Sequence, residues 1–212
     1  MEKSNFRDWT LTEVDTVFGL KQADDLPTLT EWLGVGSEVL EYEQHYLSTL
    51  QKGFKKGING FNETELANKV ISPIFVFAEL CTNDYSYFLE RKMSANISNQ
   101  ELTGRVDGMV ASGFRDPQKP FFCLNEYKRE KDPDGDPAGQ VLIAMLVAQH
   151  QNSDGLPIYG CYVIGRLWVF VVLEGNEYAF SNGFSVDNGG IYHIFNILKG
   201  LKGIINQRLG IE

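Results

Sequence analysis

The segment 137–151 is apolar on nearly every side of the helix that its sequence favours. Asp136-Pro137 is typical of an N-cap followed by proline at the first helical position. Apolar side chains then occupy almost every position from Val141 to Val147. Because a helix that is apolar all round is stable only when it is covered on most sides, this segment is expected to be well buried against other elements.

The rest of the chain supplies strands and further helices. Residues 85–90, 102–111 and 120–127 have the aromatic and β-branched content of strands. Two more strands, 158–164 and 167–173, are separated by the two-residue turn Gly165-Arg166, and 177–181 is a possible third. Amphipathic helices are expected at 29–50, at 63–81 and around 191–205. This order predicts an α/β fold, with a mixed central sheet flanked by helices.

The first part of the chain reads differently. Residues 1–28 are mixed and polar, the helix 29–50 follows, and residues 51–60 combine glycine, asparagine and lysine as loops do. We therefore expect an N-terminal helical extension over residues 1–59 and a second unit over residues 60–212.

Composition limits the classes of function. The formal net charge of −9 argues against a protein that coats nucleic acid through bulk positive charge, although a local basic cleft remains compatible with it. The three cysteines are far apart and form no CxxC pair, which is typical of reduced thiols in a cytoplasmic protein. The N-terminus has no apolar stretch like that of a secretory signal, and no apolar run is long enough to cross a membrane. A cytoplasmic protein without membrane contact is expected.

Two charges end the strand that precedes the buried helix. Glu126 and Lys128 point to the same face of the strand, because strand side chains alternate, and the same alternation places Phe122 and Leu124 on that face. Charges at the end of an otherwise apolar face, just before a loop, are expected at the rim of a cleft.

A third candidate lies on the strand before. Asp107 is flanked by Gly104 and Gly108, and glycine in a strand often allows a backbone or a ligand to approach closely. If the two strands pair, Asp107 and Glu126 converge. Two carboxylates suit Mg²⁺, and a lysine beside them can orient a water or stabilise charge on a phosphate, which together suit phosphodiester hydrolysis.

Asp107, followed 19 positions later by Glu126-Tyr127-Lys128, resembles the D…ExK core of the PD-(D/E)xK nuclease superfamily, which has the restriction-endonuclease-like fold. Residues 62–73 resemble the acidic-headed helix of the nuclease domain of type I restriction subunits. Gln140 resembles the glutamine that often follows the ExK strand. The resemblance covers about residues 60–208, and Val106 departs from it where the superfamily name implies proline.

The resemblance implies a Mg²⁺- or Mn²⁺-dependent nuclease whose expected substrate is DNA, with a role in restriction, another defence system or repair. The expected partners are nucleic acid and either a second copy of the chain or another protein. Catalytic roles then fall to Asp107, Glu126, Lys128 and Gln140. Metal ligation falls to Asp107, Glu126, Glu63 and the carbonyl of Tyr127. Glu63 is chosen over Glu65 because it precedes Leu66 by three residues and so shares the buried stripe, whereas Glu65 is placed to cap the helix or to pair with Lys69.

Two alternatives stay open. The chain may instead keep a nuclease-like fold as a non-catalytic module that binds nucleic acid or a protein partner. Lys52, Lys55 and Lys56 are either a solvated loop or a set of contacts to phosphates near the cleft.

Overall fold

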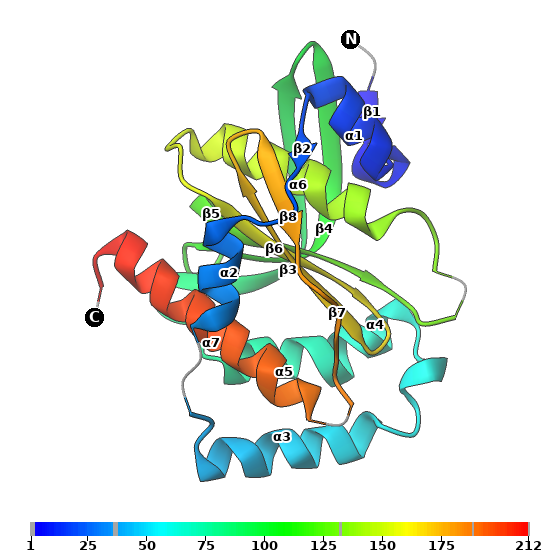
Figure 1. Ribbon diagram of the computed structural model, residues 1–212, viewed down its shortest axis with the longest axis vertical. Coiled ribbons are helices and arrows are strands. Elements are labelled where there is room, and N and C mark those ends of the chain that lie inside the picture. Colours follow the sequence, from blue (N-terminus) through cyan, green and yellow to red (C-terminus); the bar gives the residue numbers. More distant parts are fainter. Residues whose placement is uncertain (1–2, 36–37, 132, 188, 212) are drawn as a thin grey trace.

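The computed structural model describes residues 3–35, 38–131, 133–187 and 189–211. It is a mixed α/β structure in which helices cover both faces of one large sheet (Figure 1). Within the described residues, no helix is both long enough and apolar enough to cross a membrane.

The sheet has the order β1-β4-β5-β6-β7-β8-β2, with β3 also paired to β4 and β9 to β7. The β5–β6 pair is parallel, and the pairs on either side of it are antiparallel. The predicted hairpin with the Gly165-Arg166 turn is confirmed as β6 and β7. The strands are β1 (Lys3–Asn5), β2 (Lys21–Gln22), β3 (Tyr85–Ile97), β4 (Gln100–Ser112), β5 (Gln118–Lys128), β6 (Ile158–Ile164), β7 (Leu167–Glu174), β8 (Glu177–Phe180) and β9 (Phe184–Ser185).

Strand β4 changes its partner halfway along one edge. β3 pairs with it along the other edge for nearly its whole length. On the changing edge, β1 pairs in parallel with residues 101–103 and β5 pairs antiparallel with residues 108–112. Between these two registers, residues 104–107 have no strand partner on that edge among the described residues. The ends of β1 and β5 therefore run toward each other and meet beside Asp107.

Helix α6 (Pro137–Asn152) covers one face of the sheet together with α1 (Leu11–Phe18), as Figure 1 shows. As predicted, Asp136 caps α6: its side chain accepts hydrogen bonds from the N–H groups of Ala138 and Gly139. Its second carboxylate oxygen accepts from Leu11 N–H at 2.8 Å. One aspartate thus joins the first turns of both helices. The predicted burial of α6 is confirmed, since every residue from Gly139 to Ala148 is buried.

The opposite face packs against α2 (Pro27–Gly34), α3 (Glu41–Phe54), α5 (Ser72–Phe77) and α7 (Gly190–Leu209). The predicted single helix 29–50 is wrong. The chain forms α2 and α3 instead, because Gly34 ends the first helix and glycine is a weak helix former. The predicted loop at 51–60 begins later, since α3 continues to Phe54, whose side chain is buried.

The predicted helix 63–81 is interrupted and shorter. It comprises α4 (Glu63–Leu66), a π-helical turn η3 (Ala67–Ile71) and α5. The interruption of the helix that was expected at Pro73 is therefore this π-helical turn, which ends just before the proline. The helix ends at Phe77, and Glu79 has a left-handed backbone with φ of 59°. The predicted capping box of Asn62 and Glu65 is confirmed.

Residues before 60 are more than the predicted helical extension. Strands β1 and β2 pair in parallel with β4 and β8 at opposite ends of the sheet. Phe6 and Trp9 are buried in the same cluster as α6. Such short polar strands carry no periodic signal, because backbone pairing with a distant strand creates them.

We predict that Gly139→Ala destabilises the fold. An added methyl group would lie 2.6 Å from Leu11 N and 2.7 Å from Trp9 O, two backbone atoms that have no rotamer with which to move aside. Overpacking of this kind costs about 1–3 kcal/mol, measurable by urea unfolding. The matched control is Gly203→Ala in the exposed middle of α7, where the methyl group meets nothing and should stabilise by about 0.5–1 kcal/mol. Equal stability changes for the two variants would contradict this packing.

Candidate active site

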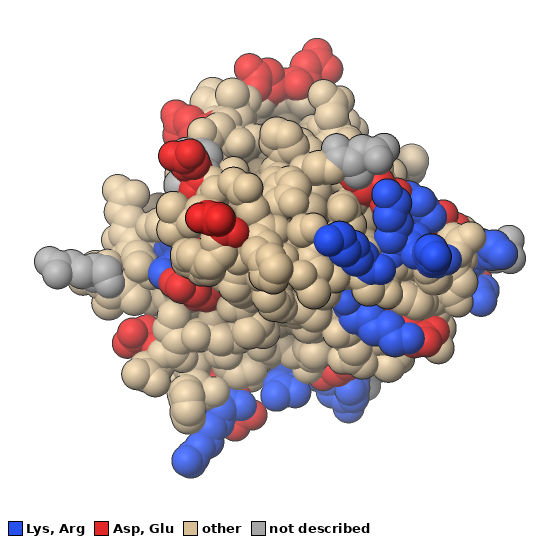
Figure 2. Space-filling view, turned by 90° about the horizontal axis from the view of Figure 1, so that it is seen from below, with Lys and Arg blue, Asp and Glu red and all other residues tan. Residues whose placement is uncertain are grey.

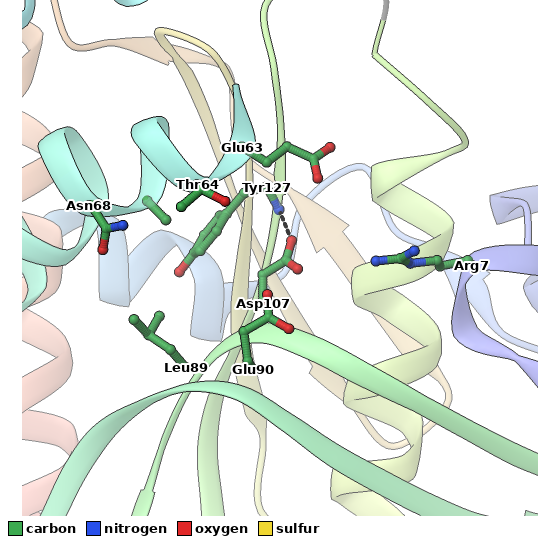
Figure 3. Close-up of a pocket in the computed structure, with 9 residues that line it drawn as sticks. Arg7, Glu63, Thr64, Asn68, Leu89, Glu90, Asp107 and Tyr127 are labelled. Atoms are coloured by element: carbon green, nitrogen blue, oxygen red, sulfur yellow. Dashed lines mark hydrogen bonds between the residues drawn. The ribbon is translucent and has the colours of Figure 1, made fainter. Parts of the chain in front are cut away.

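Asp107 lies in the stretch of β4 between the residues that pair with β1 and those that pair with β5. Its Oδ2 accepts a hydrogen bond of 2.7 Å from Tyr127 N–H, and Figure 3 shows this bond. The backbone pairing between the two strands ends at Gly108 and Asn125, and beyond it the Asp107 side chain bonds to β5 in place of the backbone. Asp107 therefore lies beside the end of β5 and bonds to Tyr127, the residue next to Glu126. That Asp107 and Glu126 share one cation stays a prediction.

Glu126 and Lys128 form an ion pair next to this bond. Lys128 Nζ lies 2.8 Å from Glu126 Oε1, and their side chains are only 7% and 10% exposed, respectively. Both side chains lie on the same face of β5 as Leu124, the face that α6 covers, as predicted. The placement of Phe122 on this face is wrong. Val110 faces Cys123 and Ala111 faces Phe121, so Phe122 is the extra residue of a β-bulge and packs in the opposite cluster.

Burial and nearby carboxylates disfavour the charged forms of both acids. Burial, and then the nearby Glu126 carboxylate, raise the pKa of Asp107 to about 7, against the opposing effects of the Tyr127 N–H and Lys128. Burial also raises the pKa of Glu126, while Lys128 acts in the opposite direction. A site that holds two ionised carboxylates here is therefore short of positive charge, which a bound cation would supply.

Two cavities lie beside Asp107 and Lys128, one at each residue, and Glu126 lines neither of them. The first has a volume of about 180 Å³ and the second about 170 Å³. Asp107 and Tyr127 line the first, together with Glu90, whose φ of 55° is rare for a residue other than glycine. Lys128 and Gln140 line the second. Arg7 and Glu63 line both, so these two residues stand where the cavities adjoin.

Glu63 lies beside the candidate site, but it is exposed and not on the buried stripe as predicted. It is the first residue of α4, and Figure 3 shows its side chain near Asp107 and Tyr127. Its negative charge acts to raise the pKa of both Asp107 and Glu126. Glu65 has the structural role that the sequence predicted. It completes the helix cap and forms an ion pair with Lys69 at 2.6 Å.

Gln140 is buried at 3% exposure in the first turns of α6. Its Nε2 donates to the carbonyl of Arg7 at 3.4 Å, whereas its Oε1 is buried without a hydrogen-bond partner. The side chain passes so close to Gly135 that a methyl group there would lie 2.4 Å from Nε2. Gln140 therefore brings an unused acceptor to the wall of the second cavity.

Arg7 is the residue of this site that the sequence did not reveal. It belongs to the short 3-10 turn η1 (Phe6–Asp8) that follows β1, and Figure 3 shows its side chain reaching toward Asp107. No spacing or periodicity links it to Asp107. The glycine beside the site has a different use from the one expected: Gly104 leaves room for the Phe6 ring, and a methyl group there would lie 2.2 Å from that ring.

No family model matches this chain. A comparison with curated proteins also finds no match. The chemistry of the site therefore has to be judged from its own groups.

The donor atoms suit a hard divalent cation with few protein ligands. Asp107 uses Oδ2 for the Tyr127 N–H, and Glu126 uses Oε1 for Lys128, so each keeps a second oxygen without a hydrogen bond from the described residues. Those residues contain no cluster of three or more acidic, histidine or cysteine side chains arranged to hold a metal. Mg²⁺ is commonly held by one or two carboxylates, with water and substrate phosphates completing its shell, and this donor set fits it.

Proposed function

We propose that this protein is a metal-dependent nuclease that hydrolyses phosphodiester bonds of DNA, with a site of the PD-(D/E)xK type. The observation that carries the proposal is that Asp107 bonds to the backbone of Tyr127, whose two neighbours Glu126 and Lys128 form a buried ion pair. Two acids and an amine from two strands are the groups that this hydrolysis uses.

Each residue has a role that follows from its position. Asp107 and Glu126 would hold Mg²⁺ or Mn²⁺, with the Tyr127 carbonyl and Glu63 as further oxygen donors. The bound ion would supply Lewis acidity and lower the pKa of a water. Lys128 is held beside Glu126, where its ammonium group can orient that water or stabilise charge on the phosphate. Gln140, with its unpaired Oε1, would tune the site through the second cavity.

A direct assay tests the proposal. Purified protein is incubated with duplex DNA, single-stranded DNA and RNA in Mg²⁺, in Mn²⁺ and in EDTA. We expect cleavage of DNA in either metal and none in EDTA. Binding of nucleic acid without cleavage in any metal would favour the alternative, a non-catalytic module of the same fold. Neither binding nor cleavage would reject both.

Exposed lysines give the substrate a place to bind. Lys52, Lys55 and Lys56 lie at the end of α3, are exposed, and form no ion pair with the described residues. Figure 2 shows lysine and arginine side chains gathered on the right-hand side of the view. Figure 1 shows the last turns of α3 and helix α4 on the right as well. In an acidic protein, such a local patch is suited to the phosphate backbone.

We predict that replacing these three lysines together with alanine weakens DNA binding and lowers its salt dependence. Each lost phosphate contact should reduce the slope of log affinity against log salt by about 0.9 for duplex DNA. Fluorescence anisotropy over a range of NaCl concentrations measures both quantities. The matched control replaces three exposed lysines from other parts of the chain, Lys21, Lys92 and Lys119. A loss equal to that of the control would assign the patch to solvation alone.

A further inference from the structure

Arg7 is held in place by its backbone while its side chain stays exposed. Asn5 Oδ1 accepts a hydrogen bond from Arg7 N–H at 3.1 Å, and Arg7 O accepts from Gln140. The ring of Phe6, the residue before Arg7, is buried against Gly104. The turn is thus fixed to β4 and to α6, so the position from which the guanidinium extends is well defined.

The guanidinium forms no hydrogen bond or ion pair within the part of the chain that the structure describes. Arg7 forms no ion pair with the described residues, although Glu63 lines the same two cavities. Its charge acts on the buried Glu126 carboxylate and favours the ionised form. An arginine whose backbone is held in place and whose side chain is exposed and unpaired, beside a partly buried acidic site, is suited to bind an anion from solution. Guanidinium groups bind phosphates through two parallel hydrogen bonds.

Arg7 approaches the proposed metal ligands from a different strand than Lys128 does. Lys128 and Glu126 reach the site from the end of β5, and Arg7 reaches it from the opposite direction, through η1 at the end of β1. Arg7 also lines the second cavity together with Lys128 and Gln140, whose Oε1 has no hydrogen-bond partner. One cavity is therefore bordered by two cationic side chains, Arg7 and Lys128, and by two carboxylates, Glu63 and Asp134.

We propose that Arg7 is a substrate-binding residue that contacts a backbone phosphate next to the one being hydrolysed. The N-terminal segment then supplies part of the active site, and is not a separate extension. This inference rests on the proposed function. The contrasting role is that of a positioning residue, in which Arg7 only balances the charge of Glu126 and touches no substrate.

Binding without catalysis separates these roles. Affinity for a labelled DNA duplex is measured in EDTA at several NaCl concentrations for wild type, Arg7→Ala and Arg7→Lys. We expect Arg7→Ala to bind about tenfold more weakly, with a salt slope smaller by about 0.9. Arg7→Lys should keep the slope and lose part of the affinity, because it keeps the charge without the planar fork. The matched control, Arg115→Ala, removes another exposed arginine and should leave both values unchanged.

The outcomes are distinct. Wild-type affinity and slope in Arg7→Ala, in a protein that binds and cleaves DNA, would overturn the role of Arg7 and leave the nuclease standing. Unchanged binding with a shifted pH profile of cleavage would assign Arg7 to positioning and also overturn the proposal. A wild-type protein that binds no nucleic acid would overturn this inference together with the proposed function.

Discussion

Lys128→Ala should lower the rate of Mg²⁺-dependent DNA cleavage by about 10²–10⁴-fold, the range expected when a group that assists proton transfer or stabilises transition-state charge is removed. Lys128 Nζ lies 2.8 Å from Glu126 Oε1, and its nearly buried side chain lines the second cavity. Single-turnover cleavage with saturating protein measures this loss at the chemical step.

The same substitution leaves Glu126 buried without its partner. Breaking a buried ion pair by removing one member costs about 3–5 kcal/mol, so thermal unfolding must accompany the assay. Lys128→Met is a useful second variant, because it fills the volume of the lysine stem without its charge. Lys131→Ala, an exposed lysine three positions later, is the control and should cleave like wild type. Equal cleavage by wild type and by a folded Lys128 variant would refute the assigned role.

Asp107→Asn should abolish cleavage and yet stabilise the metal-free protein above neutral pH. The pKa of Asp107 rises from its ordinary 3.8 to about 7 in the folded state. A raised pKa means that the folded state holds the proton more tightly than the unfolded state does. The stability that this proton provides is complete below about pH 4 and is lost as the pH rises through about 7. Asparagine never ionises, and it can still accept the Tyr127 hydrogen bond.

The variant and the wild type should therefore have similar stability near pH 4 and differ by about 2–4 kcal/mol at pH 8 in EDTA, in favour of the variant. Urea unfolding at both pH values measures this difference. Asp116→Asn, at an exposed position beyond β4, is the control and should show no such dependence. A wild type and an Asp107→Asn variant with parallel stability curves would show that Asp107 is not in a site that opposes its charge.

Local signals in the sequence predicted much of this structure. The cap at Asp136, the capping box of Asn62 and Glu65, and the β6–β7 turn each depend on neighbours within a few residues, so they could be read directly. The convergence of Asp107 with the ExK strand also followed, because adjacent antiparallel strands bring their ends together.

The rest depended on distant contacts. The bulge that turns Phe122 to the opposite face leaves no trace in the alternation of residue types. Strand β1 exists because β4 offers it an edge, and with it comes Arg7, which no spacing connects to Asp107. The helix 29–50 was overextended because a continuous apolar pattern outweighed Gly34, although α2 ends there.

Metal binding itself tests the central claim most directly. Mn²⁺ is titrated into the metal-free wild type and into Asp107→Asn by calorimetry at pH 8, where Asp107 is mostly ionised. Our account predicts saturable binding of at least one ion to the wild type, with Mg²⁺ as a competitor, and loss of that binding in the variant. Equal binding by the two proteins, or no binding by the wild type, would contradict it.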